Sequence, residues 1–135
     1  GMQFLGEALG TDTSSPRTES ADAFRAAYVE RFESEPNGPG LANSYAAAMI
    51  GLLAMEAAGE GASGTDIAAA VAKVTDPDGT AITADTAGFA TAKEVLAGGG
   101  TVSYQGATGN VRFDANGEVE YLSLVEVAAF MAGLK

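Results

Sequence analysis

The chain has 135 residues, 47% of them hydrophobic, and its mean hydropathy of +0.10 predicts a globular domain with a core of its own and excludes a disordered segment. Its 18 acidic and 7 basic residues give a formal net charge of −11, which argues against nucleic acids and anionic membrane surfaces as partners, because both attract clustered Lys and Arg. The absence of Cys and His excludes disulfides, thiol nucleophiles, Ser-His-Asp relays and ordinary zinc or haem sites.

Neither a signal peptide nor a membrane span is expected in these residues. The first residues, GMQFLGEALG, have no basic region and no long apolar core. The longest apolar run, residues 45–58, is interrupted by Glu56 and is shorter than the roughly 20 residues that span a bilayer. We therefore expect a buried helix in this run.

The first part of the chain combines a strand-like segment with a helical pattern. Residues 3–8 form a short apolar stretch that predicts a single strand, followed by a polar loop. Residues 20–33 predict an amphipathic helix that ends before Pro36. Its apolar residues at helical spacing are Phe24, Ala27, Tyr28 and Phe32.

The next helix is the most apolar of the chain. Asn43 or Ser44 is expected to cap a helix over residues 45–58. This helix is apolar nearly all round, so it should be covered on most sides.

Two shorter helices follow. Ser63 or Thr65 is expected to open the first of them, and the Asp-Pro-Asp-Gly sequence at residues 76–79 predicts the turn that closes it. Thr83 is expected to cap the second, and three glycines at residues 98–100 to end it. These glycines follow a helix and lack a Lys, so helix termination is favoured over a phosphate-binding loop.

After residue 100 the pattern changes from helical to β. Residues 101–105, 110–114 and 118–127 are the three candidate strands. The segment YQGATGNVRFDANGE predicts a small hairpin unit, because Val111 and Phe113 alternate with polar residues between glycines that permit tight turns. One strand, four helices and a β-rich end indicate a chain that holds only part of a sheet.

The acidic residues of this unit have two alternative chemical interpretations. DANGE, at residues 114–118, resembles the beginning of a calcium loop but lacks the remaining oxygen ligands, so a hairpin turn at Asn-Gly is favoured. Asp114, Glu118 and Glu120 are conceivable as the paired carboxylates of a glycosidase. Acids this close in sequence usually form a solvated face, which is the favoured interpretation.

Several motifs resemble those of a known family. Residues 104–109 read YQGATG and residues 113–118 read FDANGE, while NSYAA precedes the apolar helix and AAG ends it. In order and spacing these are similar to the YxGxSG-like turn, the FDxNGD-like turn, the AYDA segment and the AG helix end of the type I periplasmic substrate-binding proteins of branched-chain amino acid transporters, the Leu/Ile/Val-binding family. Thr replaces Ser and Glu replaces Asp in the two turns. The resemblance covers nearly the whole chain, but family members are well over twice as long.

The resemblance implies an α/β fold of the periplasmic-binding-protein type I class, with Rossmann-like lobes. This chain would be an incomplete C-terminal fragment with four helices and a few short strands. Residues 11–117 would contribute to the N-terminal lobe, and residues 1–10 and 118–135 to the hinge and the C-terminal lobe. The hinge positions would be Glu7, Gly10, Glu118 and Tyr121. A missing sheet would leave apolar helix faces exposed, which favours self-association of the fragment.

The same resemblance implies ligand contacts at the start of the apolar helix. The residues there are Leu41, Ala42, Asn43 and Tyr45. The plainer interpretation makes Asn43 a helix cap and Tyr45 a core aromatic.

The implied function is that of a non-catalytic solute-binding component of an ABC import system, periplasmic or otherwise extracytoplasmic. It would bind a small polar solute, such as an aliphatic or branched-chain amino acid or an amide, by hinge closure, and a membrane permease would recognise the closed form. No cofactor, metal or nucleic acid is expected. The alternatives are a ligand-sensing ectodomain of a receptor or regulator with the same fold and, third, a small carboxylate-based hydrolase.

Overall fold

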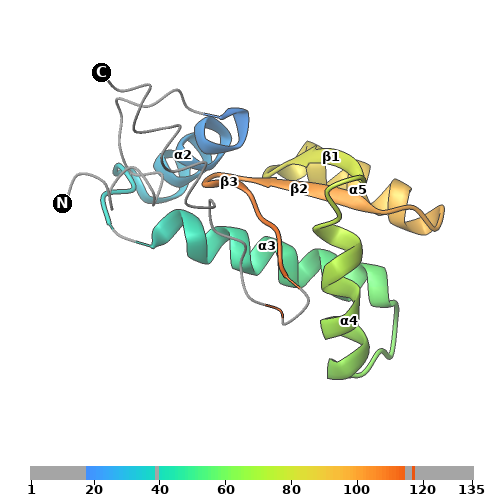
Figure 1. Cartoon of the computed structure of the whole chain (residues 1–135). Helices are drawn as coiled ribbons and strands as arrows, with labels where there is room; N and C mark the ends of the chain where they lie inside the picture. Colours follow the sequence, from blue (N-terminus) through green and yellow to red (C-terminus); the bar gives the residue numbers. More distant parts are fainter. Residues whose placement is uncertain (1–17, 39, 115–116, 118–135) are drawn as a thin grey trace, which may run out of the picture.

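The computed structural model describes residues 18–38, 40–114 and 117 (Figure 1). The strands predicted at residues 3–8 and 118–127, and the hinge positions Glu7, Gly10, Glu118 and Tyr121, lie outside the described residues. The described elements in chain order are α2 (Glu19–Phe32), α3 (Leu41–Ala58), α4 (Gly64–Val74), β1 (Thr80–Thr83), α5 (Thr86–Ala97), β2 (Val102–Gly106) and β3 (Gly109–Asn110). This part of the chain is therefore mixed helix and strand, compatible with the predicted α/β class.

The sheet has the order β1-β2-β3 in the described part of the chain. β1 and β2 are parallel, with Thr83 opposite Gln105, and α5 is the crossover between them. β3 pairs antiparallel with β2, which confirms the predicted hairpin. The predicted extent of the strand over residues 110–114 is wrong, because β3 ends at Asn110. Val111 and Phe113 lie beyond it and pack against the core.

β1 is the element that the sequence-based expectations missed. They made Thr83 a helix cap, whereas Thr83 is the last residue of β1. The cap of α5 is Asp85, whose carboxylate Oδ1 accepts a hydrogen bond of 2.7 Å from the Gly88 N–H. The strand reads TAIT and contains a single large apolar residue, so it is too short to show an alternating pattern.

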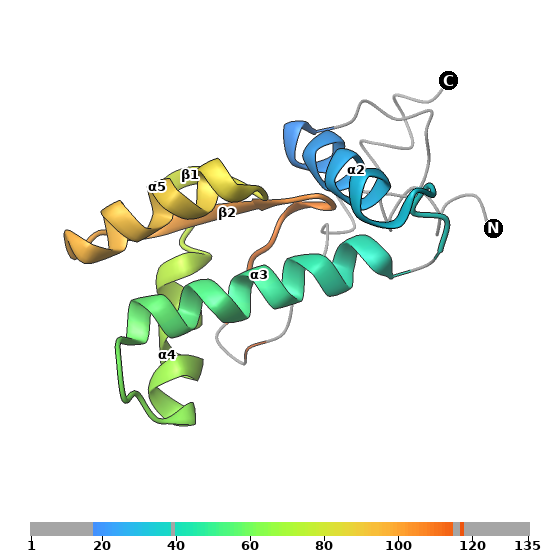
Figure 2. The same ribbon diagram turned by 180° about the vertical axis from the view of Figure 1, so that it is seen from behind.

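One side of the sheet carries the hydrophobic core. Ile82, Val102 and Tyr104 share this side, because side chains alternate along a strand, and they are buried in one cluster with residues of α3, α4 and α5. α3 and α5 contact each other and are joined by an ion pair of 3.4 Å between Lys93 Nζ and Glu56 Oε1. Figure 2 shows α5 lying across β1 and β2. The core therefore lies between the sheet and its helices.

α3 starts earlier than predicted and is less covered. It begins at Leu41 because Gly40, with a φ of 80°, supplies a left-handed turn, so neither Asn43 nor Ser44 is its cap. Only 28% of its residues are buried, which contradicts the expectation of a helix covered on most sides. By length and composition alone it could cross a membrane, a property that core helices of soluble proteins share.

The uncovered side of α3 carries large apolar residues. Leu52 and Met55 are 52% and 54% exposed. Because they lie three residues apart, these two side chains share one face of the helix.

α2 confirms the helix predicted over residues 20–33. Thr18 caps it, since its Oγ1 accepts a hydrogen bond of 3.1 Å from the Ala21 N–H. The helix ends at Phe32, before the predicted stop at Pro36, and Glu33 follows as its C-cap with a left-handed φ of 53°. α2 itself therefore follows from its own capping and helical pattern.

The predicted amphipathic character of α2 is wrong. Ser20 is its one buried residue, and Phe32 is 58% exposed. Phe24, Tyr28 and Phe32 stack on one another along the helix surface, with ring centroids 5.9 Å and 4.7 Å apart. Contacts among these three rings bury part of their apolar surface on α2 itself and not in the core.

The start of α4, the turn after it and the end of α5 agree with the features predicted from the sequence. Ser63 caps α4 in a capping box with Asp66, as one of the two predicted caps. The predicted turn after α4 is confirmed by a 3.0 Å hydrogen bond from the Gly79 N–H to the Asp76 carbonyl. α5 ends at the three glycines, where Gly99 has a φ of 79°.

Gly88 is expected to be essential for the approach of α5 to β1. A Cβ at Gly88 would lie 2.0 Å from the Thr83 carbonyl oxygen, so Gly88→Ala should lower the free energy of unfolding by about 2 kcal/mol, measured by urea titration. Gly51→Ala is the matched control, because this helical glycine in α3 has no atom within 4 Å of its added Cβ and should stabilise by about 0.5–1 kcal/mol. Equal stability of the two variants would contradict the close packing.

Candidate functional site

Ala84 joins two helices to the end of β1. This residue follows β1 directly and is fully buried. Its N–H donates a hydrogen bond of 2.9 Å to Ser20 Oγ of α2, and its carbonyl accepts one of 3.1 Å from the Tyr45 hydroxyl of α3. Both backbone polar groups of Ala84 are thus satisfied by side chains that come from far away in the sequence.

Ser20 also bridges the two parallel strands. Its hydroxyl donates a hydrogen bond of 2.5 Å to the Gln105 carbonyl while it accepts the bond from Ala84. The Thr80 N–H donates to the Thr101 carbonyl at 2.9 Å, and a parallel ladder continues in steps of two residues, so the third bond of this row would join Ala84 to Gln105. Ser20 stands in the place of that bond, between strands that begin to separate.

A hollow of about 410 Å³ lies at this end of the sheet. Its lining comes from the start of α2, from β1 and from the β2–β3 hairpin. The lining residues are Thr18, Glu19, Ser20, Ala81, Ile82, Thr83, Gln105, Gly106 and Gly109. In open α/β sheets, ligands bind in the crevice outside the carboxyl ends of parallel strands, which is the position of this hollow.

The hollow lies on the side of the sheet opposite the core. Ala81 and Thr83 alternate with the buried Ile82, and Ser103 and Gln105 are their register partners. These four side chains are exposed or half-buried and mostly polar. Gln105 Nε2 donates to Ser103 Oγ at 3.2 Å and Thr83 Oγ1 donates to Asp85 Oδ1 at 3.0 Å. The described surface here offers hydroxyl and amide groups for hydrogen bonding.

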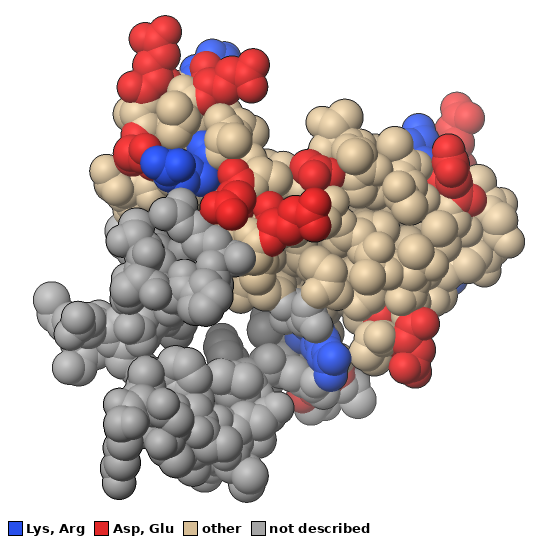
Figure 3. Space-filling view, turned by 90° about the horizontal axis from the view of Figure 1, so that it is seen from above, with Lys and Arg blue, Asp and Glu red and all other residues tan. Residues whose placement is uncertain are grey.

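The charge around the hollow is negative. Among the described residues that line it, Glu19 is the one ionisable residue and none is Lys or Arg. Figure 3 shows carboxylates gathered where α2 meets the sheet. An anion that entered the hollow would find no charged partner in this lining, whereas an amino or amide group would find oxygen acceptors.

The residues predicted to contact a ligand lie at the start of α3. None of Leu41, Ala42, Asn43 and Tyr45 lines the hollow. Ala42 is buried, Asn43 is exposed, and Leu41 and Tyr45 are half-buried. Their role as ligand contacts stays a prediction. The contact that Tyr45 makes is structural, through the Ala84 carbonyl.

Two tyrosines lie close together beneath this end of the sheet. Burial, and then the Asp85 carboxylate, raises the pKa of Tyr45. Burial, and then Tyr45, raises the pKa of Tyr104 more strongly. The Tyr104 side chain is 1% exposed and its hydroxyl is the one buried side-chain polar atom in the described residues that lacks a hydrogen-bond partner. Both groups therefore stay protonated in the folded protein at neutral pH.

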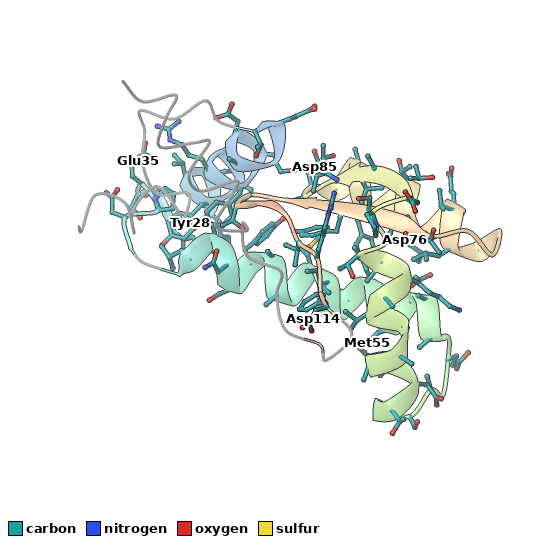
Figure 4. All side chains as sticks on the ribbon, in the orientation of Figure 1. Tyr28, Glu35, Met55, Asp76, Asp85 and Asp114 are labelled. Atoms are coloured by element: carbon teal, nitrogen blue, oxygen red, sulfur yellow. The ribbon has the colours of Figure 1, made fainter. Side chains whose placement is uncertain are left out.

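The other chemical interpretations of the sequence gain no support from geometry. The Gly117 N–H donates to the Asp114 carbonyl at 3.0 Å and Gly117 has a φ of 80°, as a turn requires. Figure 4 shows Asp114 near α3, away from Asp85 beside α2. Glu118 and Glu120 lie outside the described residues, and no group of three metal-binding side chains occurs among those described.

Ser20, Glu19, Thr83 and Gln105 are the site residues that sequence reasoning missed. Ser20 lies in the first turn of a helix, where a Ser signals only a cap or a polar surface. Thr83 belongs to the strand that went unrecognised. A recognised β1 would have placed the ends of β1 and β2 side by side, and with them Thr83 and Gln105.

Comparison with known proteins identifies no relative that informs on this site. No family model, curated protein or solved structure matches the chain.

The two tyrosines should respond in opposite ways to removal of their hydroxyl. Tyr104→Phe removes a buried hydroxyl that lacks a partner, so the free energy of unfolding should rise by about 1 kcal/mol. Tyr45→Phe removes the bond to Ala84 and should lower it by about 1 kcal/mol. Chemical denaturation of both variants measures the difference. A loss of stability in Tyr104→Phe comparable with that in Tyr45→Phe would mean that the Tyr104 hydroxyl has a partner after all.

Proposed function

We propose that this chain is the C-terminal part of a non-catalytic solute-binding protein of an ABC import system, and that it supplies one side of a cleft between two lobes. The observation that carries the proposal is the hollow at the carboxyl ends of β1 and β2, beside the start of α2. Its volume of about 410 Å³ falls in the range of small-molecule sites.

The shape of the hollow favours binding by closure. One side is formed by the sheet with the β2–β3 hairpin and another by α2, and the described residues do not enclose the hollow completely. A small solute is held tightly only when most of its surface is buried, so a second lobe would have to close over it. Ligand contacts to both lobes would then stabilise the closed form that a membrane permease recognises.

The lining favours a small polar solute with an amino or amide group. Thr83 and Gln105 offer hydrogen-bonding groups, and Glu19 offers a carboxylate. Ala81 adds a small apolar surface that an aliphatic side chain can contact. An aliphatic amino acid matches these features if its carboxylate is bound by the other lobe. The described residues of the lining include no positively charged group for a carboxylate.

The exposed face of α3 fits the same proposal. Residues 41–55 of this helix carry no charge, although the chain has a net charge of −11. In the two-lobed protein the rest of the first lobe's sheet would cover Leu52 and Met55. In the isolated chain a second copy would cover them, because an uncharged face is where two acidic chains approach with least repulsion.

Solute binding is tested by NMR titration of the isolated chain with glycine, L-alanine, L-leucine, L-valine and acetamide. The expected result is weak binding, with dissociation constants on the order of millimolar or above, because one lobe buries only part of a solute. Amide shifts should concentrate at Glu19, Thr83, Gln105 and Gly106.

A matched pair of variants locates the binding. Ala81→Phe fills the hollow and should abolish the shifts, whereas Ala69→Phe on the exposed surface of α4 should leave them unchanged. Shifts that survive Ala81→Phe would place binding elsewhere. Micromolar binding by the isolated chain would contradict the need for a second lobe.

Self-association is tested by size-exclusion chromatography with light scattering. The chain should form dimers or larger species at about 100 μM, and replacement of Leu52 and Met55 by Glu should shift it toward monomers, because two buried carboxylates oppose the contact. Phe32→Glu changes an equally exposed apolar residue on α2 and should have little effect. A monomeric wild-type chain would contradict this part of the proposal.

A further inference from the structure

α2 contributes little to the hydrophobic core. No residue of this helix belongs to the core cluster or to the apolar residues packed against it. Ser20 is the one buried residue of the helix, and every other residue in it is half-buried or exposed. In proteins, segments with few buried apolar contacts open at a lower free energy than the core does.

The described contacts that hold α2 to the sheet and α3 are concentrated near its N-terminal half. One is the Ser20 hydroxyl between Ala84 and Gln105. The other is the Phe24 ring, whose centroid lies 5.1 Å from that of Tyr45. Both contacts are linked to Ala84. Ser20 bonds to its N–H directly, and Tyr45, which Phe24 contacts, donates a hydrogen bond to its carbonyl.

The middle of α2 is tied to the segment that follows the helix. Arg25 Nε donates to Glu35 Oε2 at 2.8 Å, and a second bond joins Arg25 Nη2 to Glu35 Oε1. This bidentate pair links the helix to the chain just after it. The Tyr28 ring contacts Phe24 and Phe32, which are both on α2. These interactions persist if the helix moves as a unit.

We propose that α2 is a latch: it docks on and undocks from the carboxyl ends of β1 and β2 as one unit while the core stays folded. Undocking exposes the Ala84 N–H and the Gln105 carbonyl to water, which satisfies them in place of the serine hydroxyl. It also removes Thr18, Glu19 and Ser20 from the hollow. The hollow exists in its full form only when the latch is docked.

The latch is tested without any solute, so its test is independent of the proposed transport function. Native-state hydrogen exchange is followed in the wild-type chain at increasing urea concentrations below the unfolding transition. The Ala84 amide should exchange through an opening with a smaller urea dependence than that of global unfolding, because undocking exposes less apolar surface than unfolding of the core does. The amides of Leu53 and Val74, in the middle of the core, should exchange only through global unfolding. An Ala84 amide that exchanges with the same urea dependence as these two would overturn the proposal.

Two ring deletions on α2 separate docking from helix stability. Phe24→Ala removes the contact with Tyr45 and leaves the Ser20 hydroxyl in place, so exchange at Ala84 should become faster on the order of tenfold or more. Tyr28→Ala removes a ring that contacts only other rings of α2 among the described aromatic pairs, so exchange at Ala84 should change by less than about threefold. Equal acceleration in both variants would mean that helix unfolding, and not undocking, exposes Ala84.

Discussion

The rest of the site depends on how the buried backbone N–H and carbonyl of Ala84 are satisfied. A strand that ends inside a protein leaves backbone groups that must find partners, because a buried N–H or carbonyl without one is costly. β1 ends at Thr83, and the next peptide is fully buried. The chain satisfies it from two sides, with Ser20 on the N–H and Tyr45 on the carbonyl. These two bonds join the docked α2 and α3 to the end of β1, beside the hollow.

Much of the fold could be predicted, because most of its signals are local. A few neighbouring residues are enough to predict the capping box of Ser63 and Asp66 and the glycines that end α5. β1 was missed because four residues are too few to show an alternating pattern, and its parallel partner lies beyond a whole helix. The start of α3 was misplaced because Gly40 begins the helix through its backbone, without a capping side chain.

The candidate site could not be predicted for a related reason. The Ser20 hydroxyl reaches Ala84 across 64 residues and Gln105 across 85 residues, and no local pattern encodes either contact. The family resemblance predicts Tyr45 as a ligand contact, but Tyr45 does not line the hollow. Its hydroxyl donates a hydrogen bond to the Ala84 carbonyl at the end of β1. The polar hollow follows from strand alternation, because the apolar residues of β1 and β2 face the core and leave small and polar residues on the other side.

The latch and the hollow share the same residues, and this has a consequence for binding. If α2 docks and undocks, a solute that contacts both Glu19 and the strand ends binds only the docked state. Its measured affinity is then lowered by the fraction of undocked chains, and its binding stabilises the docked state by mass action. A second lobe that closed over the hollow would press on α2 as well as on the solute. Closure would then complete the binding surface and at the same time hold α2 in its docked position. Lobe closure would thereby be coupled to the docking contact that the Ser20 hydroxyl makes between Ala84 and Gln105.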